Sequence, residues 1–231
     1  MSAVKIAQNL ELVRQKIADR CRKNGRNPAE ITIVGISKTH PAEAASLAVK
    51  AGLADLGENR VQEAAQKIHL VRPIPIWHLV GHLQSNKAKK AVELFDVIQS
   101  IDSLELAQVL SEDAMKQGKS LNIYLQVNSS FEEQKSGFSF EDIENSLGEI
   151  IKLPSLEISG LMTIGPLTDD ISKIERSFGL TRKLFDKLQN EIGAGFNKLS
   201  MGMSGDYELA LDYGANVLRI GTAIFGEREM A

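Results

Sequence analysis

The sequence predicts an α/β fold in which eight parallel strands, each followed by a helix, close into one (β/α)8 barrel after an additional N-terminal helix. Short apolar segments alternate with helical segments along almost the whole chain, which is typical of α/β proteins. The strand segments are apolar at most positions, as expected when both faces of a parallel sheet are buried. Eight such units in 231 residues match the usual length of a barrel. Periodicity alone also permits a doubly wound open sheet.

The chain begins with a segment that we interpret as the additional amphipathic helix. Its apolar residues recur at mixed three- and four-residue spacings: Val4, Leu10, Leu12, Val13 and Ile17. Asn24-Gly25 predicts the end of this helix. Charged residues are scattered over the first 20 positions, so we expect no secretory signal.

Eight strands follow, recognised as β-branched or apolar runs of strand length such as ITIVGIS. They are predicted at 31–37, 54–57, 76–80, 95–101, 121–127, 156–163, 198–201 and 217–220. The intervening helices are predicted at 41–51, 61–70, 103–118, 140–153, 171–192 and 207–213, with one more that Ser85 caps and that carries Lys87, Lys89 and Lys90. Because no linker or low-complexity stretch interrupts the pattern, we expect one domain over 1–231.

Composition excludes several functional classes. The net charge of −3 provides no basic field for nucleic acid or an anionic membrane, and no apolar run has the length of a membrane span. Cys21 is the one cysteine, and its expected place is a small buried position in the first helix. A chain without disulfides fits a reducing compartment, so we expect a cytoplasmic protein.

Polar and glycine-rich residues follow the predicted strands, at the end where barrels carry their sites. After the seventh and eighth strands, Gly202, Gly205 and Gly221 would let backbone N–H groups approach a ligand. The hydroxyls nearby belong to Ser200, Ser204 and Thr222. We expect Ser204 also to cap the helix at 207–213, whose N-terminus favours an anion. These loops indicate a phosphate site, although simple turns would have the same composition.

Lys38 and Arg219 suggest which phosphate compound would bind. Lys38 follows the first strand, where desolvation would free its amine to form a Schiff base with an aldehyde. Taken alone, Lys38 is better explained as a strand-end lysine that reaches solvent, and the phosphate-type loops shift the interpretation toward the Schiff base. Arg219 lies in the eighth strand, and pyridoxal enzymes place an Asp or Arg against the pyridine nitrogen. An ion pair with an acidic neighbour is the alternative for Arg219.

A metal site is not expected. His78 and His82 are four residues apart, but their surroundings predict a strand, and no HExxH pattern is present. We expect one of them to line the cavity or to satisfy a buried hydrogen bond.

Taken together, the motifs resemble those of the pyridoxal phosphate (PLP) homeostasis protein family. The matching stretches are VGISKTHP, GENRVQEA, WHLVGHLQSNK, QVNSSFEEQKSGF, GLMTIGP, LSMGMSGDYELA and VLRIGTAIFGER. Each motif is weak alone, but seven in order over nearly the whole chain are specific. A proline is expected where Phe140 stands, a departure at a helix start rather than at the cofactor.

The resemblance implies a TIM barrel similar to the N-terminal domain of alanine racemase, with PLP in a Schiff base on Lys38. It implies that Arg219 faces the pyridine nitrogen and that Asn59 and Met162 line the cofactor. The implied phosphate-binding residues are Ser200, Gly202, Met203, Ser204, Gly221 and Thr222. Members of the family are regarded as PLP carriers or regulators of vitamin B6 and amino-acid pools, so apo forms of PLP-dependent enzymes are candidate recipients.

The alternative is a PLP-dependent amino-acid racemase, which needs a second acid/base group. In alanine racemases that group is a tyrosine on a second domain, and about ten residues remain here after the eighth strand. Tyr124, Tyr207 and Tyr213 are predicted within a strand or a helix. We therefore expect a PLP-binding protein without turnover, and a monomer. A third interpretation, an aldolase-type use of Lys38, leaves Arg219 without a role.

Overall fold

The computed structural model describes residues 2–132 and 134–227. The strands are β1 Thr32–Ile36, β2 Asp55–Glu58, β3 Ile76–Leu79, β4 Val97–Ile101, β5 Leu121–Gln126, β6 Leu156–Met162, β7 Lys198–Ser200 and β8 Val217–Ile220. The α-helices are α1 Ala3–Lys23, α2 Ala42–Lys50, α3 Val61–Lys67, α4 Ala88–Leu94, α5 Leu104–Lys116, α6 Phe140–Ile150, α7 Ile171–Ile192, α8 Tyr207–Asp212 and α9 Thr222–Phe225. Short 3-10 helices occur at η1 Pro28–Glu30, η2 Ile68–Leu70 and η3 Ser85–Lys87.

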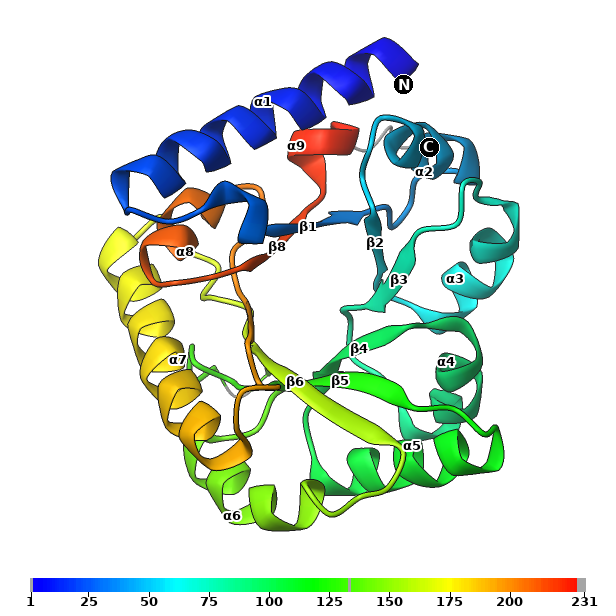
Figure 1. Cartoon of the computed structure of the whole chain (residues 1–231), viewed down its shortest axis with the longest axis vertical. Helices are drawn as coiled ribbons and strands as arrows, with labels where there is room; N and C mark the ends of the chain where they lie inside the picture. Colours follow the sequence, from blue (N-terminus) through cyan, green and yellow to red (C-terminus); the bar gives the residue numbers. More distant parts are fainter. Residues whose placement is uncertain (1, 133, 228–231) are drawn as a thin grey trace.

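The eight strands form a closed barrel in sequence order, which confirms the predicted fold and rules out an open sheet. Every neighbouring pair is parallel, and β1 closes the barrel by pairing with β8, with Thr32 opposite Val217 and Gly35 opposite Ile220. Figure 1 shows the helices arranged around the strands, with the chain passing once around the barrel. This closure places the carboxyl ends of all eight strands at one mouth.

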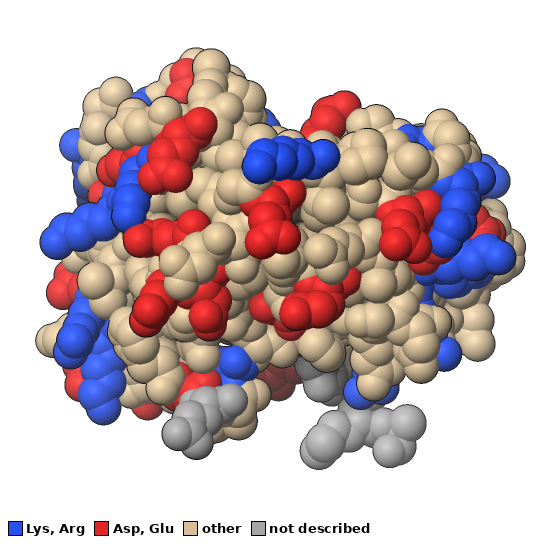
Figure 2. Space-filling model, turned by 90° about the horizontal axis from the view of Figure 1, so that it is seen from below, with Lys and Arg blue, Asp and Glu red and all other residues tan. Residues whose placement is uncertain are grey.

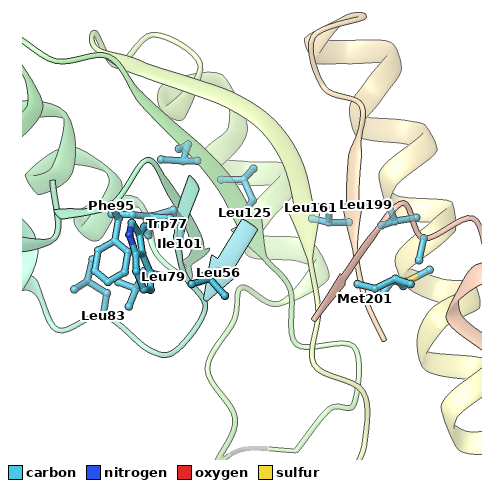
Figure 3. Close-up of a cluster of buried hydrophobic side chains, with 14 of the residues drawn as sticks. Leu56, Trp77, Leu79, Leu83, Phe95, Ile101, Leu125, Leu161, Leu199 and Met201 are labelled. Carbon is cyan, nitrogen blue, oxygen red and sulfur yellow. The ribbon is translucent and has the colours of Figure 1, made fainter. Parts of the chain in front are cut away.

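Two apolar layers hold the barrel together. The larger lies between the strands and the surrounding helices and includes the outward-facing side chains of alternate strand positions. Figure 3 shows part of it, where Trp77 of β3 packs beside Phe95 and Leu83. The smaller layer contains Val34, Ile36, Val80, Val97, Tyr124, Met162 and Val217. Because these residues come from strands or strand ends and none from a helix, this second layer fills the barrel interior.

The additional helix α1 covers one side of the barrel, across α9 and between α8 and α2 (Figure 1). Its buried face consists of Ile6, Leu10, Val13, Ile17 and Cys21. The expectation that Val4 and Leu12 belong to this face is wrong, because their side chains are 66% and 57% exposed. Cys21 is fully buried, as expected.

The expected cap of the fourth helix is also wrong. Ser85 opens the 3-10 helix η3, its side chain accepts no capping hydrogen bond, and α4 begins at Ala88. Lys87 therefore lies outside α4. In contrast, the predicted start of the next helix at Ser103 agrees with the structure, where the Ser103 side chain caps α5 by accepting from the Leu106 backbone N–H at 3.1 Å.

The face of the molecule seen in Figure 2 carries charged side chains of both signs. This face, seen from below Figure 1, has Asp and Glu side chains near its centre, with Lys and Arg flanking them. An extended basic patch, which a nucleic-acid backbone would require, is absent from this view of the described residues. None of the helices in residues 2–132 and 134–227 is long and apolar enough to cross a membrane.

Gly81 allows β2 and β3 to approach each other closely at the mouth. A Cβ at Gly81 would lie 2.3 Å from the Asn59 backbone oxygen and 2.8 Å from its Cα. Both neighbours are backbone atoms, which cannot rotate away. Any side chain at position 81 would therefore push apart the ends of the two strands.

We expect Gly81→Ala to lower the free energy of unfolding by about 1–3 kcal/mol, as overpacking does. Urea denaturation measures this change. The matched control is Gly148→Ala within α6, where an added Cβ meets nothing within 4 Å, and which should stabilise by about 0.5–1 kcal/mol. Equal stability of Gly81→Ala and the parent protein would contradict the prediction.

Candidate cofactor-binding site

The barrel brings the expected site residues to its carboxyl mouth from both ends of the chain. Lys38 lies two residues after β1, Asn59 directly follows β2, and Met162 ends β6. Ser200 ends β7, and the remaining expected residues lie in β8 or in the loops after β7 and β8. Met162, Ser200, Gly202 and Arg219 are buried, Lys38, Asn59, Ser204 and Gly221 are half-buried, and Met203 and Thr222 are exposed. The sequence motifs extend to Glu133 and Arg228, which lie outside the described residues.

A buried ion pair holds the backbone directly before Lys38. The Lys67 ammonium donates to the Ser37 carbonyl oxygen at 2.8 Å and to Glu58 Oε1 at 2.6 Å. The Ser37 hydroxyl donates to the same carboxylate oxygen at 2.6 Å. Burial raises the pKa of Glu58, and the Lys67 and Ser37 hydrogen bonds oppose that rise. The start of the turn that carries Lys38 is thus tied to α3.

The next residue of this turn is constrained as well. Thr39 has a φ of 67°, which is uncommon for a residue with a branched side chain. Its backbone N–H donates to the carboxylate of Glu63, which also lies 3.3 Å from the Lys67 ammonium. Sequence reasoning did not identify Lys67 as part of the site. Its one signal was the four-residue spacing from Glu63, which is also common on solvated helix faces.

The loop after β7 has a shape that only glycine permits at position 202. Gly202 has a φ of 91°, and a Cβ there would lie 2.6 Å from the Ala210 Cβ and 2.9 Å from the Tyr207 Cα. The following residue uses its amide within the loop, since the Met203 N–H donates to Asp206 Oδ1 at 2.6 Å. This amide is therefore not directed at a ligand in the structure.

Ser204 joins the two loops that were expected to form a phosphate site. Its hydroxyl oxygen accepts from the backbone N–H of Gly221 at 3.3 Å and of Ala223 at 3.2 Å. The expectation that Ser204 caps α8 is wrong, because Asp206 is the N-cap residue there and makes no side-chain cap. Ser204 instead meets the start of α9, a short helix that the sequence did not predict. Tertiary contact between the loops decided its partner.

Arg219 lies inside the barrel with neutral partners. Its side chain donates to the Ser200 hydroxyl at 2.6 Å and to the Thr163 carbonyl oxygen at 2.7 Å. No carboxylate of the described residues lies within 4.0 Å of it, so the alternative of an ion pair is not observed there. Burial lowers the pKa of Arg219 to about 10, and the group stays charged at neutral pH. A guanidinium has five N–H donors, so it retains capacity for an acceptor such as a pyridine nitrogen.

The two histidines have different roles, and neither joins a metal site. His78 is buried, with Nε2 at 2.9 Å from Asp55 Oδ1 and Nδ1 at 2.9 Å from Gln99 Nε2. The expectation that one histidine satisfies a buried hydrogen bond is confirmed. His82 lies in the loop beyond β3 and is bonded through Nδ1 to Asp102 at 2.8 Å. Within the described residues, no group of three or more His, Cys, Asp or Glu side chains could hold a metal ion.

Two cavities open beside the mouth and share His82. One, of about 520 Å³, lies between the loops after β2 and β3 and is lined by Asn59, Arg60 and Lys87 among others. The second, of about 220 Å³, is lined by Gln126, Lys135, Ser136 and Ile164. Of the expected site residues, Asn59 alone lines one of these two cavities.

Comparisons with known proteins agree with this geometry. The family described as "Alanine racemase, N-terminal domain" matches residues 5–229. A "Pyridoxal phosphate homeostasis protein" of Pseudomonas aeruginosa is 41% identical over 226 residues, covering 97% of this chain and 96% of the relative. One of Escherichia coli K12 is 38% identical over 231 residues, covering 97% of each chain.

Solved structures give the same relationship. PipY of Synechococcus elongatus, described "with PLP bound", has a TM-score of 0.85 and 38% identity and covers 96% of this chain and all of its own. A histidine racemase of Leuconostoc mesenteroides has a TM-score of 0.75 at 18% identity, and this chain spans 59% of its length. The racemase likeness shows the fold alone. By sequence and by structure, the chain belongs to the alanine racemase N-terminal domain family and, within it, to the pyridoxal phosphate homeostasis proteins.

Proposed function

We propose that this protein holds PLP as a Schiff base on Lys38 and serves intracellular PLP homeostasis without catalytic turnover. The observation that carries the proposal is the buried Arg219 guanidinium inside the barrel, which has no carboxylate partner among the described residues and is bonded to the Ser200 hydroxyl and the Thr163 carbonyl oxygen at the ends of β7 and β6. A guanidinium in this position can donate a hydrogen bond to an unprotonated ring nitrogen. A relative that is 38% identical has been solved with PLP bound, which supports the same ligand here.

Most of the expected residues have a role in this proposal. The Lys38 amine would bond the aldehyde carbon, and Asn59 and Met162 would line the ring. The phosphate would be held by Gly202, Ser204, Gly221 and Thr222. The Ser200 hydroxyl and the Met203 N–H already donate to Gln99 and Asp206, so these two expected residues are left out of the proposed phosphate site. When bound, PLP supplies an electrophilic carbon and an electron-withdrawing ring. Because Arg219 stays charged, it would keep the ring nitrogen unprotonated and weaken that withdrawal.

The tyrosines argue against the racemase alternative. Burial raises the pKa of all three: Tyr124 inside the barrel, Tyr207 in α8, whose pKa reaches about 12, and Tyr213 at the end of α8. A general base works best with a pKa near the operating pH. None of the three is therefore suited to take a proton from a substrate carbon.

We also infer a cytoplasmic monomer whose recipients are apo forms of PLP-dependent enzymes. The single cysteine supports a reducing compartment. A carrier needs a surface from which the cofactor can leave, and the mouth is open. Gel filtration tests whether the protein is a monomer. Mixing the loaded protein with an apo-enzyme, and measuring whether that enzyme recovers activity, tests the transfer of PLP.

We expect purified protein loaded with PLP to be yellow, and hydride reduction to attach the pyridoxyl group to Lys38. Lys38→Ala should be colourless and unlabelled, because no other amine is proposed to face the aldehyde. Peptide mass spectrometry locates the label. The control is Lys87→Ala, which removes another lysine beside the mouth and should label normally. A reducible chromophore in Lys38→Ala would overturn the assignment.

Ser204→Ala should weaken PLP binding about tenfold or more, since hydrogen bonds to charged groups contribute about 1.5–3 kcal/mol. Pyridoxal, which lacks the phosphate, should bind both proteins equally. Titration of the absorption change with each ligand gives the dissociation constants. An equal loss for both ligands would indicate that Ser204 supports the fold of the loop and does not bind phosphate.

Racemase activity is tested by inversion at the substrate α-carbon. We expect loaded protein incubated with L-alanine in D2O to form no deuterated D-alanine above the level formed with free PLP, because inversion needs an acid/base group on each face of the α-carbon and none of the three tyrosines suits the second role. Chiral chromatography with mass spectrometry separates the two enantiomers. Fast inversion of alanine or another amino acid would reverse the preference for a binding protein.

A further inference from the structure

A row of polar side chains crosses the barrel interior, where barrels usually place branched apolar residues. His78, Gln99, Ser200 and Arg219 are each 4% exposed or less. Gln99 belongs to β4 and Ser200 to β7, which are not neighbours in the sheet. Their contact therefore passes through the interior, surrounded by the inner apolar layer. Buried polar groups are costly unless every one is bonded, and here each has a partner.

The row is continuous from one end of the barrel to the other. Arg219 donates to the Ser200 hydroxyl at 2.6 Å, and that hydroxyl donates to Gln99 Oε1 at 2.7 Å. Gln99 Nε2 lies 2.9 Å from His78 Nδ1, and His78 Nε2 lies 2.9 Å from Asp55 Oδ1. Asp55 is the first residue of β2, so the row starts at the end opposite the mouth.

The direction of each hydrogen bond follows from the one before it. A guanidinium can only donate, so Ser200 accepts from Arg219 and gives its single proton to the Gln99 carbonyl. The Gln99 amide then donates to His78 Nδ1, which is unprotonated in this arrangement. The remaining ring proton of His78, on Nε2, is donated to the Asp55 carboxylate. The guanidinium at one end, which can only donate, and the Asp55 carboxylate at the other, which can only accept, fit one direction of donation along the row.

We propose that Asp55, His78 and Gln99 are positioning residues that hold Arg219, through Ser200, in the plane that faces the pyridine nitrogen of PLP. This inference rests on the proposed function. It adds residues of the barrel interior, which would not touch PLP, to those that position the cofactor. Within residues 2–132 and 134–227, no carboxylate forms an ion pair with Arg219, and an arginine side chain has about 2 kcal/mol of rotamer entropy to lose. Two directed bonds, to Ser200 and to the Thr163 carbonyl, orient it, and Gln99 in turn orients Ser200.

Few other charges act on this row. Asp206 raises the pKa of Arg219 against the effect of burial, and Tyr124 lies close enough to Asp55 for that charge to raise the tyrosine pKa further. Neither forms a hydrogen bond to a member of the row. If Gln99 is lost, the Ser200 hydroxyl can rotate and Arg219 loses a directed partner. The ring nitrogen of bound PLP would then take up a proton at higher pH.

The test compares Gln99→Met, which keeps the length of the side chain, with His78→Phe, which breaks the row one bond farther away. Ser111→Ala is the control, since it removes a buried hydrogen bond to the Pro154 carbonyl far from the mouth. Each protein is loaded with PLP, and its visible absorption and circular dichroism are followed against pH. We expect the transition midpoint to rise by about one pH unit in Gln99→Met, by less in His78→Phe and not at all in Ser111→Ala.

The outcomes separate this inference from the proposed function. Failure of the parent protein to give a reducible chromophore would overturn both. A normal parent chromophore, with spectra of folded Gln99→Met and His78→Phe that match it at every pH, would overturn the positioning role alone. If urea denaturation shows that one variant is unfolded, the other carries the test. If both are unfolded, the row maintains the barrel and the proposal is wrong.

Discussion

The pairing of β1 with β8 is the constraint on which the site depends. Four residue pairs, from Thr32–Val217 to Gly35–Ile220, join the first and last strands. Because the pairing is parallel, the segments after both strands emerge at the same mouth. Lys38 and the Gly221–Thr222 loop are thereby brought together from opposite ends of the chain. A doubly wound sheet built from the same strands would leave them apart.

Around this closure, the structure uses buried polar contacts to hold the mouth in shape. On the outer side, Lys67 and Glu58 tie the turn before Lys38 to α3. On the inner side, Arg219 is held by Ser200 and by a backbone carbonyl. Buried ion pairs and polar rows contribute little net stability compared with apolar packing. Their placement on both sides of one lysine supports a role in geometry.

The likeness to racemases concerns the barrel fold. The chemistry depends on the side chains that the barrel carries at its mouth. The chain spans about three fifths of the length of the histidine racemase, at 18% identity, and shares the barrel with it. The homeostasis proteins match along their whole length. In the described residues, burial raises the pKa values of the three tyrosines, which makes them poor general bases near neutral pH.

The sequence by itself determined the alternation of strands and helices and the motifs that follow the strands, because burial periodicity and glycine placement are local properties. Periodicity permitted both a barrel and an open sheet, and the pairing of β1 with β8 decided between them. Only the tertiary structure decided the partners of Ser204, Lys67 and His78. Ser204 was expected to cap the next helix but meets residues 221 and 223 instead. The row from Asp55 to Arg219 joins five strands. Contacts between residues far apart in the chain leave no periodic signal, so they exist only once the barrel has closed.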